Sequence, residues 1–132
     1  MNISINDEGL PKSSITQEYS ANETIANEGD TETGWYVLLE GKVGVYKHSK
    51  KVAEFDQRGV VFGELSGILN TTRTASLRAL ERTRVVYFKA TLDQLITLYP
   101  YVAKKIMVNL AERLAKTTDE LIFAVEKDQK EK

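Results

Sequence analysis

The chain changes its sequence pattern once, near residue 90, and this change limits the available folds more than any other feature. Between residues 15 and 88, short runs rich in β-forming residues are separated by glycine turns at intervals of about ten residues. Beyond Pro100 the chain contains neither glycine nor proline, so nothing there interrupts a helix. The sequence therefore predicts a mainly β fold with some α, a β-sandwich or β-barrel followed by helices.

The strands are predicted from runs of β-forming side chains between turn residues. Residues 35–39 and 43–46 flank Glu40-Gly41, and we expect them to close as a hairpin. Further strands are expected at 15–19, 51–55, 74–80 and 83–88, after a polar lead-in over residues 1–14.

The helices are predicted from their start signals. Thr91 and Gln94 have the spacing of a capping box, which predicts a short helix ending near Leu98. Pro100 suits the first turn of a second helix, expected over residues 101 to about 127.

The composition excludes several classes of function. The 132 residues fit one domain, and 42% hydrophobic residues suffice for one core. A formal net charge of −1 argues against a nucleic-acid surface and against polybasic membrane binding. The chain has no signal-peptide pattern and no apolar run of the roughly 20 residues that span a bilayer. We therefore expect a cytoplasmic protein that binds neither nucleic acid nor membranes.

Catalytic and metal chemistry are not expected either. The absence of cysteine removes thiolate ligands and thiol nucleophiles. His48 is the only histidine, and we expect it to be exposed in a turn. Metal-binding barrels need several histidines, and hydrolases need a base beside their nucleophile. We expect no enzyme activity, no metal and no cofactor. The aromatic residues expected in the core are Trp35, Tyr36, Phe55, Phe62 and Phe88.

The segment 62–76 has the chemistry of a phosphate site. Glu64 follows Gly63 and opens a short apolar helical turn, and Arg73 precedes a strand of small and apolar residues. Amides at the start of a short helix favour an anion, and arginine adds a planar fork of donors for phosphate oxygens. A carboxylate beside an anion is useful when it accepts hydrogen bonds from a ribose hydroxyl. These residues together indicate a nucleotide.

The same segment resembles the phosphate-binding cassette of cyclic nucleotide-binding domains. That family has Phe-Gly-Glu-Leu-Ala followed by a short helical turn and Arg-(Thr/Ser/Ala)-Ala, and here Arg73 lies ten positions after Gly63. The upstream runs Glu28-Gly29-Asp30 and Trp35-Tyr36-Val37-Leu38, with Gly41, are also similar to the family pattern. The resemblance covers residues 18 to about 126. It implies a jelly-roll (double-stranded β-helix) barrel with a short helix in the cassette and C-terminal helices.

The resemblance implies a role for each cassette residue. Glu64 would accept the ribose 2′-hydroxyl, and Arg73 would pair with an equatorial phosphate oxygen. The cradle, which begins at Gly63, would be completed by the amides of Leu65, Ser66 and Ala75 and by the Thr74 hydroxyl. Two departures bear on affinity: Thr72 replaces the usual proline, and Arg58-Gly59-Val60 replaces the usual Pro-Gly-Asp turn. The implied ligand is cAMP, with cGMP as the second candidate because Thr74 fits both.

The predicted long helix carries an apolar seam. Small or apolar residues recur in steps of four and three, the spacing of a coiled coil with one polar interruption. We expect a homodimer through this helix; the alternative is that the stripe packs on the barrel of its own chain. The seam residues are Ala103, Met107, Leu110, Leu114, Thr117, Leu121 and Ala124.

The chain resembles the sensor half of bacterial catabolite-activator-type regulators, and its predicted long helix resembles their dimer helix. By this resemblance, Arg113 would lie near the ribose and Glu64. Thr117 would contact the adenine of its own subunit and Thr118 that of the partner subunit. The sequence then divides into a nucleotide-binding unit over 1–99 and a lid or dimerisation helix over 100–132, without a DNA-binding domain. Whether the chain acts alone or belongs to a longer regulator stays open.

Two functions are compatible with these patterns. The first is a cyclic-nucleotide-binding regulatory module that signals occupancy by repositioning its C-terminal helix. The second is a scaffold of the same fold that has lost its ligand and acts through helix pairing or partner binding.

Overall fold

A computed structural model describes residues 10–11 and 13–131 of the chain, so most of the predicted polar lead-in lies outside the described residues. Eight strands form two four-stranded antiparallel sheets. The first sheet has the order β1 (Ile15–Tyr19), β8 (Thr83–Phe88), β3 (Trp35–Glu40), β6 (Val61–Phe62). The second has the order β2 (Thr24–Ala26), β7 (Ser76–Ala79), β4 (Val43–Lys47), β5 (Lys50–Phe55).

The core lies on both faces of β3, which is buried at every residue except Glu40. Tyr36 and Leu38 point into a cluster with residues of the second sheet, including Val43 and Leu77. Trp35, Val37 and Leu39 belong to a second cluster that includes helical residues. Since side chains alternate along a strand, β3 joins an inter-sheet core to a sheet–helix core.

The predicted hairpin between residues 35–39 and 43–46 is wrong. β3 pairs with β6 and β8, whereas β4 pairs with β5 and β7, so the chain changes sheets at Gly41. Gly41 has φ +105°, and a Cβ there would lie 2.4 Å from Thr83 Oγ1. Two β-rich runs around a glycine resemble a hairpin locally. Burial of both faces of β3 instead favours a connection in which the chain passes from one sheet to the other. The other expected strands are present, and β2 and β6 were not anticipated.

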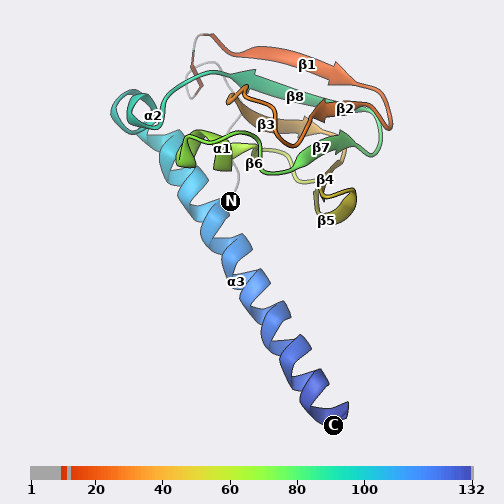
Figure 1. Cartoon of the computed structure of the whole chain (residues 1–132). Helices are drawn as coiled ribbons and strands as arrows, with labels where there is room; N and C mark the ends of the chain where they lie inside the picture. The colour runs from red at the N-terminus through yellow and green to blue at the C-terminus, as the bar shows by residue number, and fades with distance from the viewer. Residues whose placement is uncertain (1–9, 12, 132) are drawn as a thin grey trace.

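Three helices follow the pattern expected from the sequence. α1 (Glu64–Leu69) lies in the cassette, and α2 (Leu92–Leu98) begins at Thr91 with both hydrogen bonds of the predicted capping box. α3 (Pro100–Glu131) extends the predicted second helix by one residue at its start and four at its end. Figure 1 shows the sheets gathered at one end of the molecule and α3 projecting away from them.

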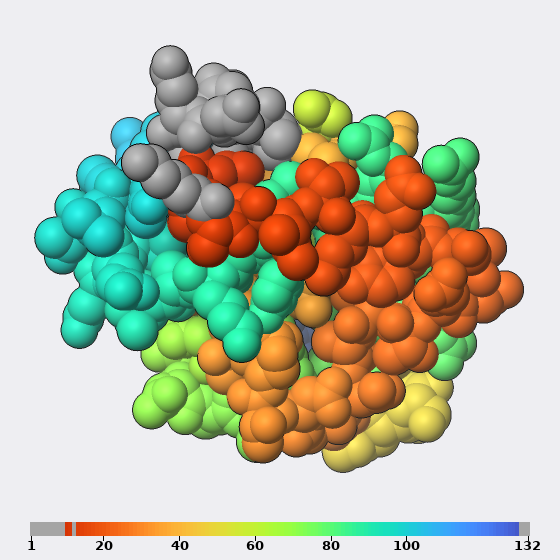
Figure 2. All heavy atoms as spheres, turned by 90° about the horizontal axis from the view of Figure 1, so that it is seen from above, coloured from red at the N-terminus to blue at the C-terminus, as the bar shows by residue number. Residues whose placement is uncertain are grey.

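Figure 2 views this end from above, where the N-terminal part of the described chain, in red and orange, spreads across the face beside the cyan helical segment. The described strands form two facing sheets of the jelly-roll type, and no pairing among them closes a barrel. Within the described residues, no helix combines the length and apolar character needed to cross a bilayer.

The predicted seam on α3 divides between two environments. Ala103 is buried in the sheet–helix core and Leu110 packs against it. Met107, Leu114 and Leu121 are 70%, 68% and 64% exposed. The start of the stripe therefore packs on its own chain, as the alternative reading expected. The three exposed residues, spaced seven apart, are not covered by the described part of the chain, and the homodimer stays a prediction.

Candidate functional site

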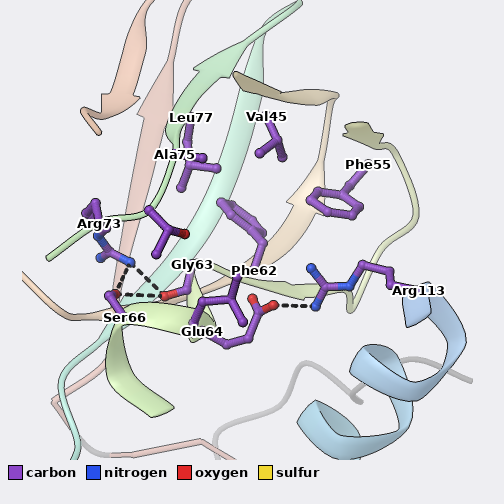
Figure 3. Close-up of a pocket in the computed structure, with 12 residues that line it drawn as sticks. Val45, Phe55, Phe62, Gly63, Glu64, Ser66, Arg73, Ala75, Leu77 and Arg113 are labelled. Atoms are coloured by element: carbon purple, nitrogen blue, oxygen red, sulfur yellow. Dashed lines mark hydrogen bonds and ion pairs between the residues drawn. The ribbon is translucent and has the colours of Figure 1, made fainter. Parts of the chain in front are cut away.

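A cavity of about 80 Å³ lies between the second sheet, the cassette and α3 (Figure 3). Its apolar wall comes from strands β4, β5, β6 and β7, and its polar side comes from the cassette and one arginine of α3. The lining residues are Val45, Phe55, Phe62, Gly63, Glu64, Leu65, Ser66, Arg73, Thr74, Ala75, Leu77 and Arg113.

The cassette backbone depends on two glycines. Gly63 has φ +72°, a left-handed conformation that favours glycine, and a Cβ there would lie 2.8 Å from Arg73 Nη1. Gly67 allows α1 to approach Trp35, because a Cβ would meet its ring at 2.7 Å. The turn into α1 and its close packing therefore explain why this segment contains glycine at both positions.

Arg73 is buried and strongly held, with an exposed fraction of 3%. Its Nη1 donates to Gly63 O at 2.7 Å and to Ser66 Oγ at 3.1 Å. Its Nη2 donates to Gly34 O at 2.7 Å and to Glu32 Oε2 at 2.9 Å. A guanidinium has five N–H donors, and only the Nε–H is left without a partner among the described residues.

The turn before β3 holds the backbone around Arg73. Gly29 N–H donates to Arg73 O and Arg73 N–H donates to Asp30 O, both at 2.8 Å. Glu28 N–H donates to Ser76 Oγ at 2.9 Å. These bonds join the 28–30 turn to the cassette, so the upstream residues that resemble the family pattern are the ones that position the arginine.

Glu64 is the most buried polar group of the cavity, at 1% exposure. Its Oε1 lies 2.5 Å from Arg113 Nη2, and neither carboxylate oxygen receives a geometrically sound hydrogen bond from a described residue. The Arg113 guanidinium also lies 5.2 Å from the centre of the Phe55 ring. This ion pair links the cassette to α3. Removal of Arg113 would leave the buried Glu64 charge without compensation.

Tyr36 closes the inner side of the site. Its ring stacks on Phe62 at a centroid distance of 5.1 Å, and Arg73 Cζ lies 5.3 Å from its centre. Burial raises the pKa of Tyr36 to about 12, with the Arg73 charge acting in the opposite direction. Tyr36 is therefore a neutral wall beside the arginine at physiological pH.

The structure brings together nearly all of the residues selected from the sequence. Those lining the cavity are Gly63, Glu64, Leu65, Ser66, Arg73, Thr74, Ala75 and Arg113. Thr117 and Thr118 lie on exposed turns of α3 and do not line it.

Glu32 and the apolar wall were not identified from the sequence. Glu32 is bonded to Arg73 and also to Tyr87. Nothing in the spacing separates it from the other acidic residues near the 27–30 turn. Phe62 is in the core as expected, whereas Phe55 is partly buried and borders the cavity. His48 is exposed, as expected.

The cavity combines two unmet hydrogen-bonding needs. Glu64 is ion-paired with Arg113, but neither of its carboxylate oxygens accepts a hydrogen bond from a described residue, and the Arg73 Nε–H has no acceptor among those residues. A buried polar group without a partner costs free energy, and a bound molecule removes that cost. The arrangement suits a ligand with a hydroxyl and an anionic oxygen. Among the described residues, no group of three or more potential metal ligands is present.

Comparison with known proteins agrees with this chemistry. Residues 16–97, more than half of the chain, match the family model "Cyclic nucleotide-binding domain". The regulatory subunit of cAMP-dependent protein kinase from Schizosaccharomyces pombe is 32% identical over 82 residues, which cover 61% of this chain and 20% of that protein. A lysophospholipase NTE1 from Phaeosphaeria nodorum is 26% identical over 121 residues, or 87% of this chain and 8% of the enzyme.

Solved structures show the same similarity in three dimensions. The catabolite activator protein of Thermus thermophilus superposes with a TM-score of 0.69 at 28% identity, covering 86% of this chain and 55% of that one. A cAMP-bound structure of PfPKA-R superposes with a TM-score of 0.65 at 26% identity, covering 83% and 37%. The chain spans a fifth or less of the length of the two curated relatives named above, the S. pombe regulatory subunit and the P. nodorum lysophospholipase. With the family model matched and the cassette in place, the chain belongs to the cyclic nucleotide-binding domain family.

Proposed function

We propose that this chain is a regulatory module that binds cAMP and performs no catalysis itself. The observation that carries the proposal is that two buried residues of one cavity have groups without a hydrogen-bond partner in the described part of the chain, the Glu64 carboxylate oxygens and Arg73 Nε. The cyclic phosphate would accept from Arg73 and from the cassette amides, and the ribose 2′-hydroxyl would donate to Glu64. The choice of cAMP over cGMP rests on the relatives that bind cAMP by name. The cytoplasmic location stays a prediction.

Occupancy would be signalled through α3. The Arg113–Glu64 pair connects the cassette to this helix within the described residues. A ribose hydroxyl that donates to Glu64 would compete with Arg113 for the carboxylate or change the orientation of its side chain. Either change alters the contact between α3 and the cassette. A ligand shifts a conformational equilibrium only by its differential affinity for the two states, and this ion pair supplies such a difference.

Dimerisation is the second part of the proposal. Met107, Leu114 and Leu121 form an exposed apolar row with heptad spacing, which a second copy of α3 would cover. In this arrangement residues 1–99 act as the nucleotide-binding unit and 100–132 as the lid and dimerisation helix. Base contacts by Thr117 and Thr118 stay a prediction from the resemblance, because both lie outside the cavity.

A scaffold without ligand is the alternative function, favoured by the same exposed row. Arg73 already has protein acceptors for both terminal nitrogens, so the fold stands without a ligand. Under this alternative, Arg73→Ala would leave partner binding intact and Leu114→Asp would abolish it.

Thermal unfolding with and without cAMP tests the proposed function. Binding at a hundredfold excess over Kd stabilises the folded state by about 2.7 kcal/mol, which raises the unfolding temperature by several degrees. The wild type is expected to show this rise, and Arg73→Gln is expected to lose most of it. An equal rise in both proteins would contradict a role for Arg73 in binding.

A further inference from the structure

The end of the cassette is held by a lysine that lies outside the cavity. Lys47, the last residue of β4, donates from Nζ to Thr74 O at 2.5 Å. Thr74 and Ala75 line the nucleotide cavity, whereas Lys47 does not. Figure 3 shows Ala75 between Leu77 and Arg73 at one wall of that cavity. Lys47 therefore contacts the cassette backbone without lining the space that a ligand would occupy.

Glu28 holds the Lys47 ammonium group in place. Its Oε2 lies 3.3 Å from Lys47 Nζ, and its Oε1 accepts from the His48 N–H at 3.1 Å. The Glu28 N–H in turn donates to Ser76 Oγ at 2.9 Å. The turn before β3, the end of β4 and the start of β7 thus meet around Lys47. A carboxylate and a carbonyl together fix the ammonium group more firmly than solvent fixes an ordinary surface lysine.

A carbonyl fixed in this way also fixes the amide that follows it. Thr74 C=O and Ala75 N–H belong to one trans peptide unit, which is planar, so the two groups point in opposite directions. The hydrogen bond from Lys47 therefore directs the Ala75 N–H away from the ammonium group. Ala75 lies one residue before β7, and its N–H has no acceptor among the described residues. This backbone donor at the cavity wall is available to a ligand.

We propose that Lys47 is a positioning residue for the phosphate: it holds the Thr74 carbonyl and so orients the Ala75 N–H toward an anionic oxygen of the ligand. The inference rests on the proposed function, in which cassette amides bind the cyclic phosphate. A donor that is oriented before binding loses less conformational freedom when the ligand arrives. The charge on Lys47 also polarises the peptide unit, which strengthens its N–H as a donor.

Calorimetric titration of Lys47→Met with cAMP tests this role. Methionine keeps an unbranched stem and removes the donor, and the Lys47 side chain is 44% exposed, so the variant is expected to fold. Lys51→Met is the matched control, because the Lys51 side chain is 47% exposed and pairs with Glu54, and neither residue lines the cavity. Lys47→Met is expected to bind cAMP about fivefold more weakly than the wild type, the effect of one ordinary hydrogen bond. Lys51→Met is expected to bind cAMP as the wild type does.

Ionic strength separates positioning from long-range attraction between Lys47 and the phosphate. At 1 M salt the Debye length is about 3 Å, so attraction by a distant exposed charge is screened. The weaker binding of Lys47→Met, relative to the wild type, is expected to persist at about 1 M salt. A difference that disappears in high salt would overturn the positioning role.

The NMR signal of the Ala75 amide gives a readout that a merely structural role of Lys47 would not change. In the wild type, the amide proton is expected to move downfield on saturation with cAMP. This shift is expected to be smaller in Lys47→Met and unchanged in Lys51→Met.

An Ala75 signal that does not move in the wild type would overturn the inference, and this measurement needs no variant to fold. Equal cAMP affinities of Lys47→Met and the wild type would overturn it as well. In either case, Arg73-dependent cAMP binding would leave the proposed function standing. If the wild type binds no cyclic nucleotide, the proposed function fails and the role of Lys47 fails with it.

Discussion

At the scale of residues, the site rests on two ion pairs whose buried members, Arg73 and Glu64, line one cavity. Arg73 is paired with Glu32, and Glu64 is paired with Arg113. Each pair compensates a buried charge. Among the described residues, the Arg73 Nε–H has no hydrogen-bond acceptor and the Glu64 carboxylate oxygens have no hydrogen-bond donor. A ligand that supplied these hydrogen-bond partners would remove the cost of leaving the buried groups unpaired.

Replacement of Glu64 by glutamine is expected to remove recognition of the ribose hydroxyl. Hydrogen bonds to charged groups contribute about 1.5–3 kcal/mol each. The wild type is therefore expected to bind cAMP at least about tenfold more tightly than 2′-deoxy-cAMP. Glu64→Gln is expected to bind both with similar affinity, as measured by calorimetric titration. A variant that kept the wild-type ratio would show that Glu64 does not contact the hydroxyl.

Gly63→Ala is expected to impair both stability and binding. The left-handed conformation costs about 1–3 kcal/mol for a residue with a Cβ, and the new atom would displace Arg73 Nη1 and the Tyr36 ring. Gly59→Ala is the matched control for the backbone cost, because its φ is likewise positive, at +90°, and it does not line the cavity. Chemical denaturation should show a loss for both variants, and only Gly63→Ala should lose cAMP affinity. Equal affinities of the two variants would contradict the steric account.

At the scale of elements, local signals predicted much of the fold. The capping box at Thr91 was confirmed because its two hydrogen bonds lie within four residues of chain. Gly63, Glu64 and Arg73 were brought together as expected, because α1 and the turn after it are short. The hairpin at Gly41 was mispredicted because pairing between β3 and β8 depends on residues far apart in the sequence.

The hairpin between β4 and β5 is attached to the cassette side through Glu28. Hydrogen bonding from the His48 backbone N–H, followed by the nearby Lys47 charge, lowers the pKa of Glu28 below its ordinary value of 4.5. A carboxyl with a lowered folded-state pKa adds stability above pH 4.5, and this stability is lost as the pH falls through the folded-state pKa.

Glu28→Gln is therefore expected to lower the free energy of unfolding at pH 7, with a gap from the wild type that narrows in acid. Chemical denaturation at pH 7 and about pH 3 measures this gap. Glu126→Gln on α3 is the control, since Glu126 has no ion pair among the described residues and should give no pH-dependent gap. A gap of constant size across the pH range would contradict the assignment.

The exposed row on α3 predicts the oligomeric state. Leu114→Asp is expected to convert a dimer into a monomer in sedimentation measurements, because a charge on the seam opposes pairing. Ala115→Asp, the adjacent exposed position, is expected to leave the dimer intact. The variant should lose the part of its thermal stability that comes from dimerisation. The stability of the monomer itself should change little, since Leu114 is 68% exposed. A monomeric wild type at high concentration with cAMP would contradict this pairing.

At the scale of the whole molecule, the structure joins a nucleotide cavity to a projecting helix (Figure 1). The sequence pattern predicted the cassette helix and the long helix, and the family resemblance predicted that Arg113 lies near Glu64, with which it forms an ion pair. Glu32, Lys47 and Phe55 could not be selected in the same way. Their environment depends on strands, cassette and α3 meeting in space, and each is an ordinary residue in its own segment.

Calorimetric titration of the wild-type chain with cAMP tests the central claim most directly. A cavity with an unused Arg73 donor and unused Glu64 acceptors is expected to give saturable heat with one ligand per chain. 5′-AMP, which lacks the cyclic phosphate, is expected to bind much more weakly. Absence of heat at millimolar cAMP, with an unchanged unfolding temperature, would contradict the account.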